Sequence, residues 1–374
     1  MGFVSSYFFK WRLVGSLFLL LALAACQSEE FPLTRFEDSP IIDSLLASAP
    51  HFVVSTDTEP ERWVATTRRG LPNDSLVLGR PAHMVAIGDS MYISDDSGRH
   101  IFAVGVDGYL RRKIGRQGQG PGEFNNPVEG LKYNGSRVFV WELGRVQVFT
   151  ETFEFVDSFL SLGYLMDRFS VSPDYIFLEC PGAPLESDWL VCARSAAPPH
   201  DGIPGIALLP SLDLPNQGGE NGYLITVTPD GDRIALAYKG LPYIFVYDDQ
   251  FRHVRTIRFE GKEVENFQPS GFPGQAGIEL PAGTEAFTQA FLFTMKFVDS
   301  RYLIVRVAKG GGNGDYILDV SEDEYQLARK IVFRPMNDPE EKKDIVAADY
   351  LLHGDHLYVS SIWEEYVYGY EFEL

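Results

Sequence analysis

The feature that most constrains the fold of this chain is an internal repeat. Residues 84–114 (MVAIGDSMYISDDSGRHIFAVGVDGYLRRKI) and 128–160 (VEGLKYNGSRVFVWELGRVQVFTETFEFVDSFL) have the same order of elements. In both, an apolar segment and a glycine-containing turn lead into an alternating strand, and an acidic loop with Gly-Arg leads into a third strand. Another turn precedes a fourth strand. Each unit is therefore predicted to be a four-stranded antiparallel meander.

The repeat returns in weaker form along the rest of the chain. A degenerate copy spans residues 166–212, and later copies span residues 223–259, 291–333 and 349–374, the last of which ends after three strands. The third strands are predicted to begin near Ile101, Val146, Ile244, Ile317 and Val367. The Pro/Gly-rich stretch 261–289 is interpreted as an insertion between two copies.

Six meanders of four strands predict an all-β protein, a six-bladed β-propeller over residues 46–374. The last blade lacks a strand, and two stretches before the first copy have strand character, residues 51–54 and 62–67. We expect this N-terminal region to supply the missing strand, because an unclosed ring would leave two sheet edges open to aggregation. An open solenoid or a pair of β-sandwiches is the alternative.

The N-terminus has the layout of an export signal. Lys10 and Arg12 precede a short apolar run, and Leu23-Ala24-Ala25-Cys26 follows. This tetrad resembles the lipobox of bacterial lipoproteins. The resemblance implies that residues 1–25 are removed, that Cys26 carries the lipid, palmitate included, and that residues 26–45 form a polar tether to a membrane. A plain signal peptide with an incidental cysteine is the alternative.

The residues after Cys26 bear on the final location. Gln27-Ser28-Glu29-Glu30 lacks the aspartate that retains enterobacterial lipoproteins at the inner membrane. It resembles the glutamine and acidic-pair signal that sends Bacteroidetes lipoproteins to the cell surface. An outer-membrane location is therefore expected, with the choice between periplasmic and surface faces left open. An ordinary polar tether is the alternative interpretation.

The net charge of the chain disfavours strongly anionic partners. The signal holds Lys10 and Arg12, so its removal lowers the 32 basic residues to 30 against 52 acidic ones, a mature net charge of about −22. Such a surface repels nucleic acid and anionic lipid, and it is compatible with neutral glycans or basic protein patches. The membrane is expected to be reached through the lipid alone, and the protein is expected to be a monomer.

Two cysteines remain for the folded part. Cys180 and Cys192 flank the turn-forming stretch Pro-Gly-Ala-Pro, in a compartment that is oxidising. A disulfide across a hairpin is predicted. A metal site is the alternative, although two sulfurs without a nearby histidine are a weak ligand set. No cofactor is expected.

The glycine-rich stretch GRQGQGPGEF, residues 115–124, is either a phosphate cradle or a turn. A Walker loop needs Gly-Lys-Ser/Thr opening a helix, and a dinucleotide fingerprint also needs a helix after its glycines. Here Gly122 is followed by Glu123-Phe124-Asn125-Asn126, and Pro127 precedes an alternating strand from Val128. We therefore predict a turn that links two blades.

The stretch DGYLRRKIGRQGQGPGEFNNPVEG resembles the NHL-repeat consensus, and so do MYISDDSGRHIFAV and VFVWELGRVQVF. The likeness is specific over residues 84–150, although Gly98 stands where the consensus has asparagine. The whole resembles six-bladed propeller lipoproteins of Bacteroidetes. The resemblance implies a fold and no single activity.

Acidic residues fall at equivalent loops of the first two units. Asp95, Asp96 and Glu142 lie on neighbouring blades, where two carboxylates can bind calcium or act as an acid and base pair. The alternative is that each carboxylate pairs with the arginine that follows it, Arg99 or Arg145, to fix its own loop. The NHL consensus carries this acid and arginine structurally. No catalytic or metal-binding set is predicted from the histidines.

Aromatic residues recur in or beside the loops between second and third strands. These residues are Trp141, Tyr243, Tyr316, Trp363 and Tyr366. In a closed ring these loops share one face, and an acidic rim lined with aromatic rings suits sugars. The alternative is that these rings pack between sheets. The predicted function is non-catalytic recognition of a glycan or an envelope protein by a membrane-anchored binding or scaffolding module. A metal-assisted hydrolase, lyase or lactonase at the channel mouth is the alternative.

Overall fold

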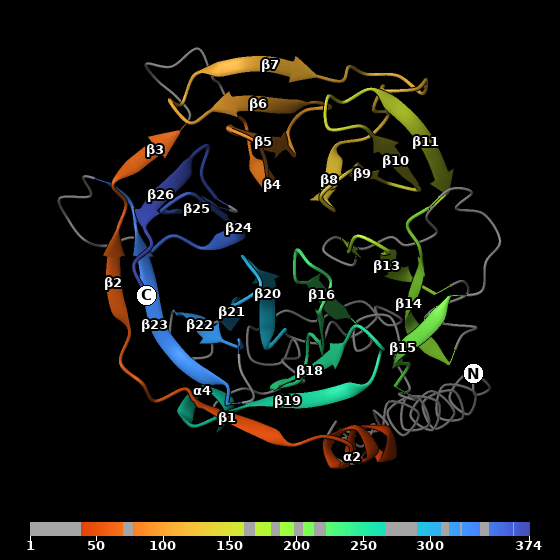
Figure 1. The fold of residues 1–374 in the computed structure, drawn as a ribbon. Coiled ribbons are helices and arrows are strands. Elements are labelled where there is room, and N and C mark those ends of the chain that lie inside the picture. Colours follow the sequence, from red (N-terminus) through yellow and green to blue (C-terminus); the bar gives the residue numbers. More distant parts are fainter. Residues whose placement is uncertain are drawn as a thin grey trace, which may run out of the picture. The chain divides into compact units, whose positions relative to one another are not determined.

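Six sheets stand around a common axis in the computed structural model of the protein (Figure 1). The structure describes residues 39–69, 78–160, 169–180, 188–197, 205–212, 222–265, 290–307, 314–321, 324–336, 344–361 and 363–374. Each sheet is a meander whose first strand is innermost, and the inner strands contact one another in chain order until the last meets the first. The predicted six-bladed β-propeller of four-stranded antiparallel blades is confirmed.

The first three blades follow the chain directly. Blade 1 consists of β4 (Pro81–Ile87), β5 (Ser90–Asp95), β6 (Ile101–Gly105) and β7 (Leu110–Ile114). Blade 2 consists of β8 (Val128–Tyr133), β9 (Val138–Glu142), β10 (Arg145–Phe149) and β11 (Phe155–Leu160). Blade 3, the degenerate copy, consists of β12 (Ser170–Val171), β13 (Tyr175–Glu179), β14 (Trp189–Ser195) and β15 (Ile206–Pro210).

The other three blades also contain strands from the N-terminal segment. Blade 4 has β16 (Tyr223–Val227), β17 (Arg233–Tyr238), β18 (Tyr243–Asp248) and β19 (His253–Glu260). Blade 5 has β20 (Leu292–Phe297), β21 (Tyr302–Val307), β22 (Asp315–Asp319) and β23 (Gln326–Arg334). Blade 6 has β24 (Ala347–His353), β25 (His356–Ser361) and β26 (Val367–Glu371). All five predicted third-strand starts lie within two residues of the observed ones.

The missing outer strand of blade 6 is β3 (Thr67–Arg69), which pairs antiparallel with β26. The predicted closure by an N-terminal strand is therefore confirmed, at the end of the second candidate stretch. The rest of that region has a second role. β1 (His51–Ser55) adds in parallel to β19, and β2 (Glu61–Val64) adds in parallel to β23. Residues 51–69 thus form a belt along the outside of blades 4, 5 and 6 (Figure 1).

Among the described residues the core forms six apolar clusters, one between each pair of neighbouring blades. Successive side chains of a strand point to opposite faces of its sheet. On β9, Val138 and Val140 pack against blade 1, whereas Phe139 and Trp141 pack against blade 3. Because both faces of each blade are buried, the central strands contain almost continuous apolar residues.

The sequence predicted that the folded body begins at residue 46, but regular structure begins earlier, at Pro40. Helix α2 (Pro40–Ala47) starts with proline at its first position, where no intrahelical N–H is required. Its Ile42 is buried in the cluster between blades 3 and 4. Across the described ranges, no helix combines the length and the apolar character needed to cross a bilayer.

A buried ion pair fastens the belt beside helix α4 (Lys262–Glu265), at the start of the predicted insertion. Residues 266–289 of that insertion lie outside the described residues. The Nζ of Lys330 donates to the carbonyl of Thr56 at 2.7 Å and pairs with Glu263 at 2.9 Å. The other carboxylate oxygen of Glu263 accepts the Tyr316 hydroxyl at 3.0 Å. This clasp connects the end of β1 with blade 5.

Breaking the clasp on one side is expected to destabilise the protein strongly. Lys330→Met leaves the Glu263 carboxylate buried without its cation, so the free energy of unfolding should fall by about 3 kcal/mol. The double variant Lys330→Met/Glu263→Leu should lose clearly less, because no unpaired charge remains. Urea unfolding measures both. Arg258→Met, at an exposed pair with Glu260, is the control and should cost less than about 1 kcal/mol. Equal losses for Lys330→Met and Arg258→Met would contradict the clasp.

Candidate functional site

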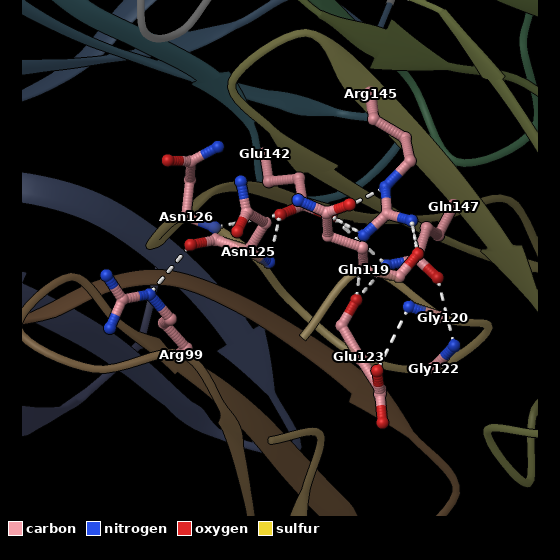
Figure 2. Close-up of polar contacts among 10 residues, drawn as sticks. All are labelled: Arg99, Gln119, Gly120, Gly122, Glu123, Asn125, Asn126, Glu142, Arg145 and Gln147. Carbon is pink, nitrogen blue, oxygen red and sulfur yellow. Dashed lines mark hydrogen bonds and ion pairs between the residues drawn. The ribbon is translucent and has the colours of Figure 1, made fainter. Parts of the chain in front are cut away.

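All eight candidate side chains come from one end of the ring. Strands alternate in direction within a blade, so the linker into each inner strand and the loop after each second strand lie at the same end. These linkers and loops are called the loop-bearing face below. Its best-defined part joins blades 1 and 2, where Figure 2 shows the polar contacts.

Asp95, at the end of β5, is buried and holds the linker that enters blade 1. Its carboxylate accepts the backbone N–H groups of Gly79 and Arg80, each at 2.9 Å. It also accepts both the N–H and the hydroxyl of Ser97. Burial alone would raise the pKa of Asp95, but the hydrogen bonds from Ser97, Gly79 and Arg80 outweigh it and lower the pKa. The carboxylate is therefore ionised and fully engaged at neutral pH.

The pairing expected for Arg99 is not the one that the structure contains. Asp96 forms its ion pair with Arg80, from the linker before β4. The Nε of Arg99 instead donates to the carbonyl of Asn125 at 2.8 Å, across to the linker of blade 2 (Figure 2). Asp96 therefore fixes the linker of its own blade, and Arg99 ties blade 1 to the linker of blade 2.

Glu142, at the end of β9, repeats the role of Asp95 and does pair with the arginine that follows it. Oε2 accepts the backbone N–H groups of Asn125 and Asn126 at 2.7 and 3.0 Å. Oε1 accepts the Nε of Arg145 at 2.8 Å. Glu142 is 1% exposed. Both oxygens are therefore used in holding the linker to the blade (Figure 2).

The glycine-rich linker is a turn, as predicted, and β8 follows it. Its backbone groups bond within the protein: the N–H of Gly120 to Glu123 and the N–H of Gly122 to Gln147, each at 3.0 Å. The carbonyl of Glu123 accepts both Arg145 and Gln147 (Figure 2). Gly122 has a φ of 74°, which favours glycine. With these amides occupied, the linker has no preformed cradle for phosphate.

Most of the candidate aromatic residues are packed between neighbouring blades. Trp141, Tyr243 and Tyr316 are buried in the clusters between blades 2 and 3, 3 and 4, and 4 and 5. They do not line an open rim, because both faces of their blades are covered. Trp363 is different, with 73% of its surface exposed in the β25–β26 loop. Tyr366 is half-buried beneath the guanidinium of Arg68, 4.5 Å from its ring centroid.

Other residues at this end were not singled out from the sequence. Leu143, Trp189 and Phe293, from blades 2, 3 and 5, are each about 40% exposed. Glu129, at the start of β8, is half-buried, and burial together with the Asp96 charge raises its pKa. The position of Leu143 in a tight β9–β10 turn is a signal of exposure. An inner-strand residue such as Phe293 gives no such signal.

A further polar group lies at the axis and was also missed. The Nζ of Lys296 on β20 pairs with both oxygens of Asp349 on β24, at 2.8 and 2.9 Å. It also donates to the carbonyl of Met84 on β4 at 3.1 Å, so it joins blades 5, 6 and 1. Burial would raise the pKa of Asp349, but the charges of Lys296, Lys132 and His83 lower it.

The cysteines complete the predicted set. Cys180 and Cys192 form a disulfide, and their Cα atoms are 5.0 Å apart. Cys192 lies on β14 and Cys180 directly follows β13, so the bond joins neighbouring strands of blade 3. Cys26 lies outside the described residues. Among the residues that are described, no group of three or more His, Cys, Asp or Glu side chains is placed to hold a metal ion.

Comparison with known proteins supports the fold. No family model and no curated protein matches the chain. A solved protein of Bacteroides fragilis described as exported has 11% identity and a TM-score of 0.51, over 83% of this chain and 87% of its own. A member of the DUF4221 family from Bacteroides vulgatus has 10% identity and a TM-score of 0.52, over 83% and 98%. At these identities the similarity is one of fold, and the NHL-like character of residues 84–150 stays a prediction.

Proposed function

We propose that the protein is an exported, lipid-anchored propeller of the bacterial outer membrane that binds a glycan on its loop-bearing face without catalysing a reaction. The observation that carries this proposal is the exposure of Trp363, a residue that is 73% exposed at that face. An indole presents a flat apolar surface to a sugar ring while nearby polar groups bond its hydroxyls. The exposed carboxylate of Glu365 lies two residues away.

A glycan suits this surface better than a protein partner does. Trp363 is followed directly by Glu364 and Glu365, so acidic residues interrupt the apolar surface of this loop. Stable protein interfaces need roughly 1,000 Å² or more of buried surface with few charges at its centre. A sugar ring needs one or two aromatic faces and a few hydrogen-bonding groups. The acidic balance of the chain also favours a neutral glycan over a polyanionic one.

The carboxylates considered for catalysis support a non-catalytic role. Asp95 and Glu142 each accept two backbone N–H groups of a linker, and Asp96 is paired with Arg80. A general acid or base must exchange a proton with substrate, and a metal ligand must offer a free lone pair. These side chains already serve as fixed acceptors that hold the loops in place.

Substitution of the exposed tryptophan tests the binding surface. Neutral polysaccharides (a glucan, a mannan and a galactan) should include one that raises the melting temperature of the mature protein. Trp363→Ala should weaken that binding about tenfold, because the stacking surface is lost. Tyr109→Ala removes the aromatic ring of a residue that is 62% exposed in the turn at the other end of blade 1, and it should leave binding unchanged. Equal loss in both variants, or no response to any polysaccharide, would refute the proposal.

Glu142→Gln separates a structural carboxylate from a catalytic one. The amide keeps one acceptor but turns an N–H group toward the linker or Arg145, so the free energy of unfolding should fall by about 2 kcal/mol. Polysaccharide binding by the folded variant should match the wild type. Glu61→Gln, at an exposed pair with Arg329, is the control and should change stability by less than about 1 kcal/mol. Full stability in Glu142→Gln would argue for the catalytic alternative.

Lipidation is tested at Cys26 in the full-length chain. Wild-type protein expressed in a Gram-negative host should incorporate labelled palmitate and sediment with outer membranes. Cys26→Ser should lose both the label and the sedimentation, because the acyl chains supply the membrane affinity. Ser28→Ala keeps the Leu23–Cys26 tetrad and should behave as the wild type. A labelled Cys26→Ser protein would refute this anchor.

A further inference from the structure

Four inner strands carry a polar residue at the same register. Lys132, Ser170, Thr226 and Lys296 each occupy the pair next to the last in the first hairpin of their blades, opposite Phe139, Phe177, Ala235 and Ile304. They belong to blades 2, 3, 4 and 5, which follow one another around the ring. The register places these four residues at one height along the axis, and they are called the polar arc below.

The side chain of Lys296 shows that a lysine at this register extends to the inner strands of other blades. Its ammonium group pairs with Asp349 on blade 6 and donates to the carbonyl of Met84 on blade 1. Lys132 has the same length at the same register, and its charge also acts on Asp349. Both lysines therefore act on the same carboxylate, that of Asp349, which only Lys296 contacts directly.

The remaining hydrogen-bonding capacity of the polar arc is cationic and donor-rich. Within the described ranges, the half-buried Lys132 has no hydrogen-bond or ion-pair partner, and neither does the hydroxyl of Ser170. The hydroxyl oxygen of Thr226 accepts the N–H of Phe297 at 3.0 Å, which leaves its proton to be donated. Ser170 and Thr226 are each only 4% exposed.

We propose that the polar arc binds a small oxyanion, a carboxylate, phosphate or sulfate group, on the axis of the ring. Lys132 is its principal cation, and Ser170 and Thr226 donate hydroxyl protons to it. Charge-assisted hydrogen bonds to such an anion would satisfy these donors and balance the second ammonium group. The acidic surface repels polyanions, so the ligand is small. This site is independent of the proposed glycan surface at Trp363.

Calorimetric titration of the full-length protein with sodium phosphate, sulfate and acetate tests this site. Chloride keeps the ionic strength constant. The wild type should bind at least one of these anions, and Lys132→Met should weaken that binding at least tenfold. Lys113→Met removes the same charge from the exposed outer strand β7 and should have no effect. Ser170→Ala should weaken binding about threefold, and it carries the test if Lys132→Met fails to fold.

The results of this titration identify the kind of anion that binds. They also show whether the anion site and the glycan surface fail independently of each other. Binding of acetate alone points to a carboxylate, and tighter binding of glucuronate than acetate points to one borne by a sugar. Binding of phosphate or sulfate points to those groups. Trp363→Ala should bind the anion as the wild type does, so failure of the glycan surface leaves this site intact. No binding to the wild type, or equal binding by Lys132→Met and Lys113→Met, would overturn the proposal.

Discussion

The pairing of β3 with β26 is the interaction on which the rest of the ring depends. Thr67, Arg68 and Arg69 pair with Gly369, Tyr368 and Val367, so a strand that precedes blade 1 in the chain and the last strand of blade 6 are held in one sheet. A propeller blade buries both of its faces against neighbours. Separation of these strands would open the outer edge of blade 6 at β26, whose Val367 packs in the cluster with blade 1 and whose Tyr368 and Tyr370 pack in the cluster with blade 5.

The belt extends this closure beyond a single sheet. β1 and β2 add to blades 4 and 5 before β3 enters blade 6, so one segment joins three consecutive blades. Strand addition of this kind also covers the outer edges of two sheets, which would otherwise expose unpaired N–H and C=O groups. The clasp at Lys330 and Glu263 fixes the belt by side chains as well as by its backbone.

The sequence allowed the blades to be predicted because each repeats the same order of strands and turns, and because strand starts follow alternation and glycine placement. It did not allow the burial and the contact partners of individual side chains to be predicted. Trp141 and Tyr316 alternate as rim residues would, but both faces of their blades are buried, so the period of two does not identify an exposed side. Arg99 contacts a linker in the next blade, a partner that no local spacing indicates.

Polar residues have different roles at the loop-bearing face and near the axis. At the loop-bearing face, carboxylates accept linker N–H groups, and this fixes the loops in one geometry with no cost of ordering when a ligand arrives. At the axis, Lys296 is hydrogen-bonded to Asp349 and Met84, whereas Lys132, which also acts on the Asp349 carboxylate, has no hydrogen-bond or ion-pair partner among the described residues. Because the overall charge is strongly negative, two lysines that act on one carboxylate near the axis are the less expected arrangement, and this arrangement is the basis of the proposed anion site.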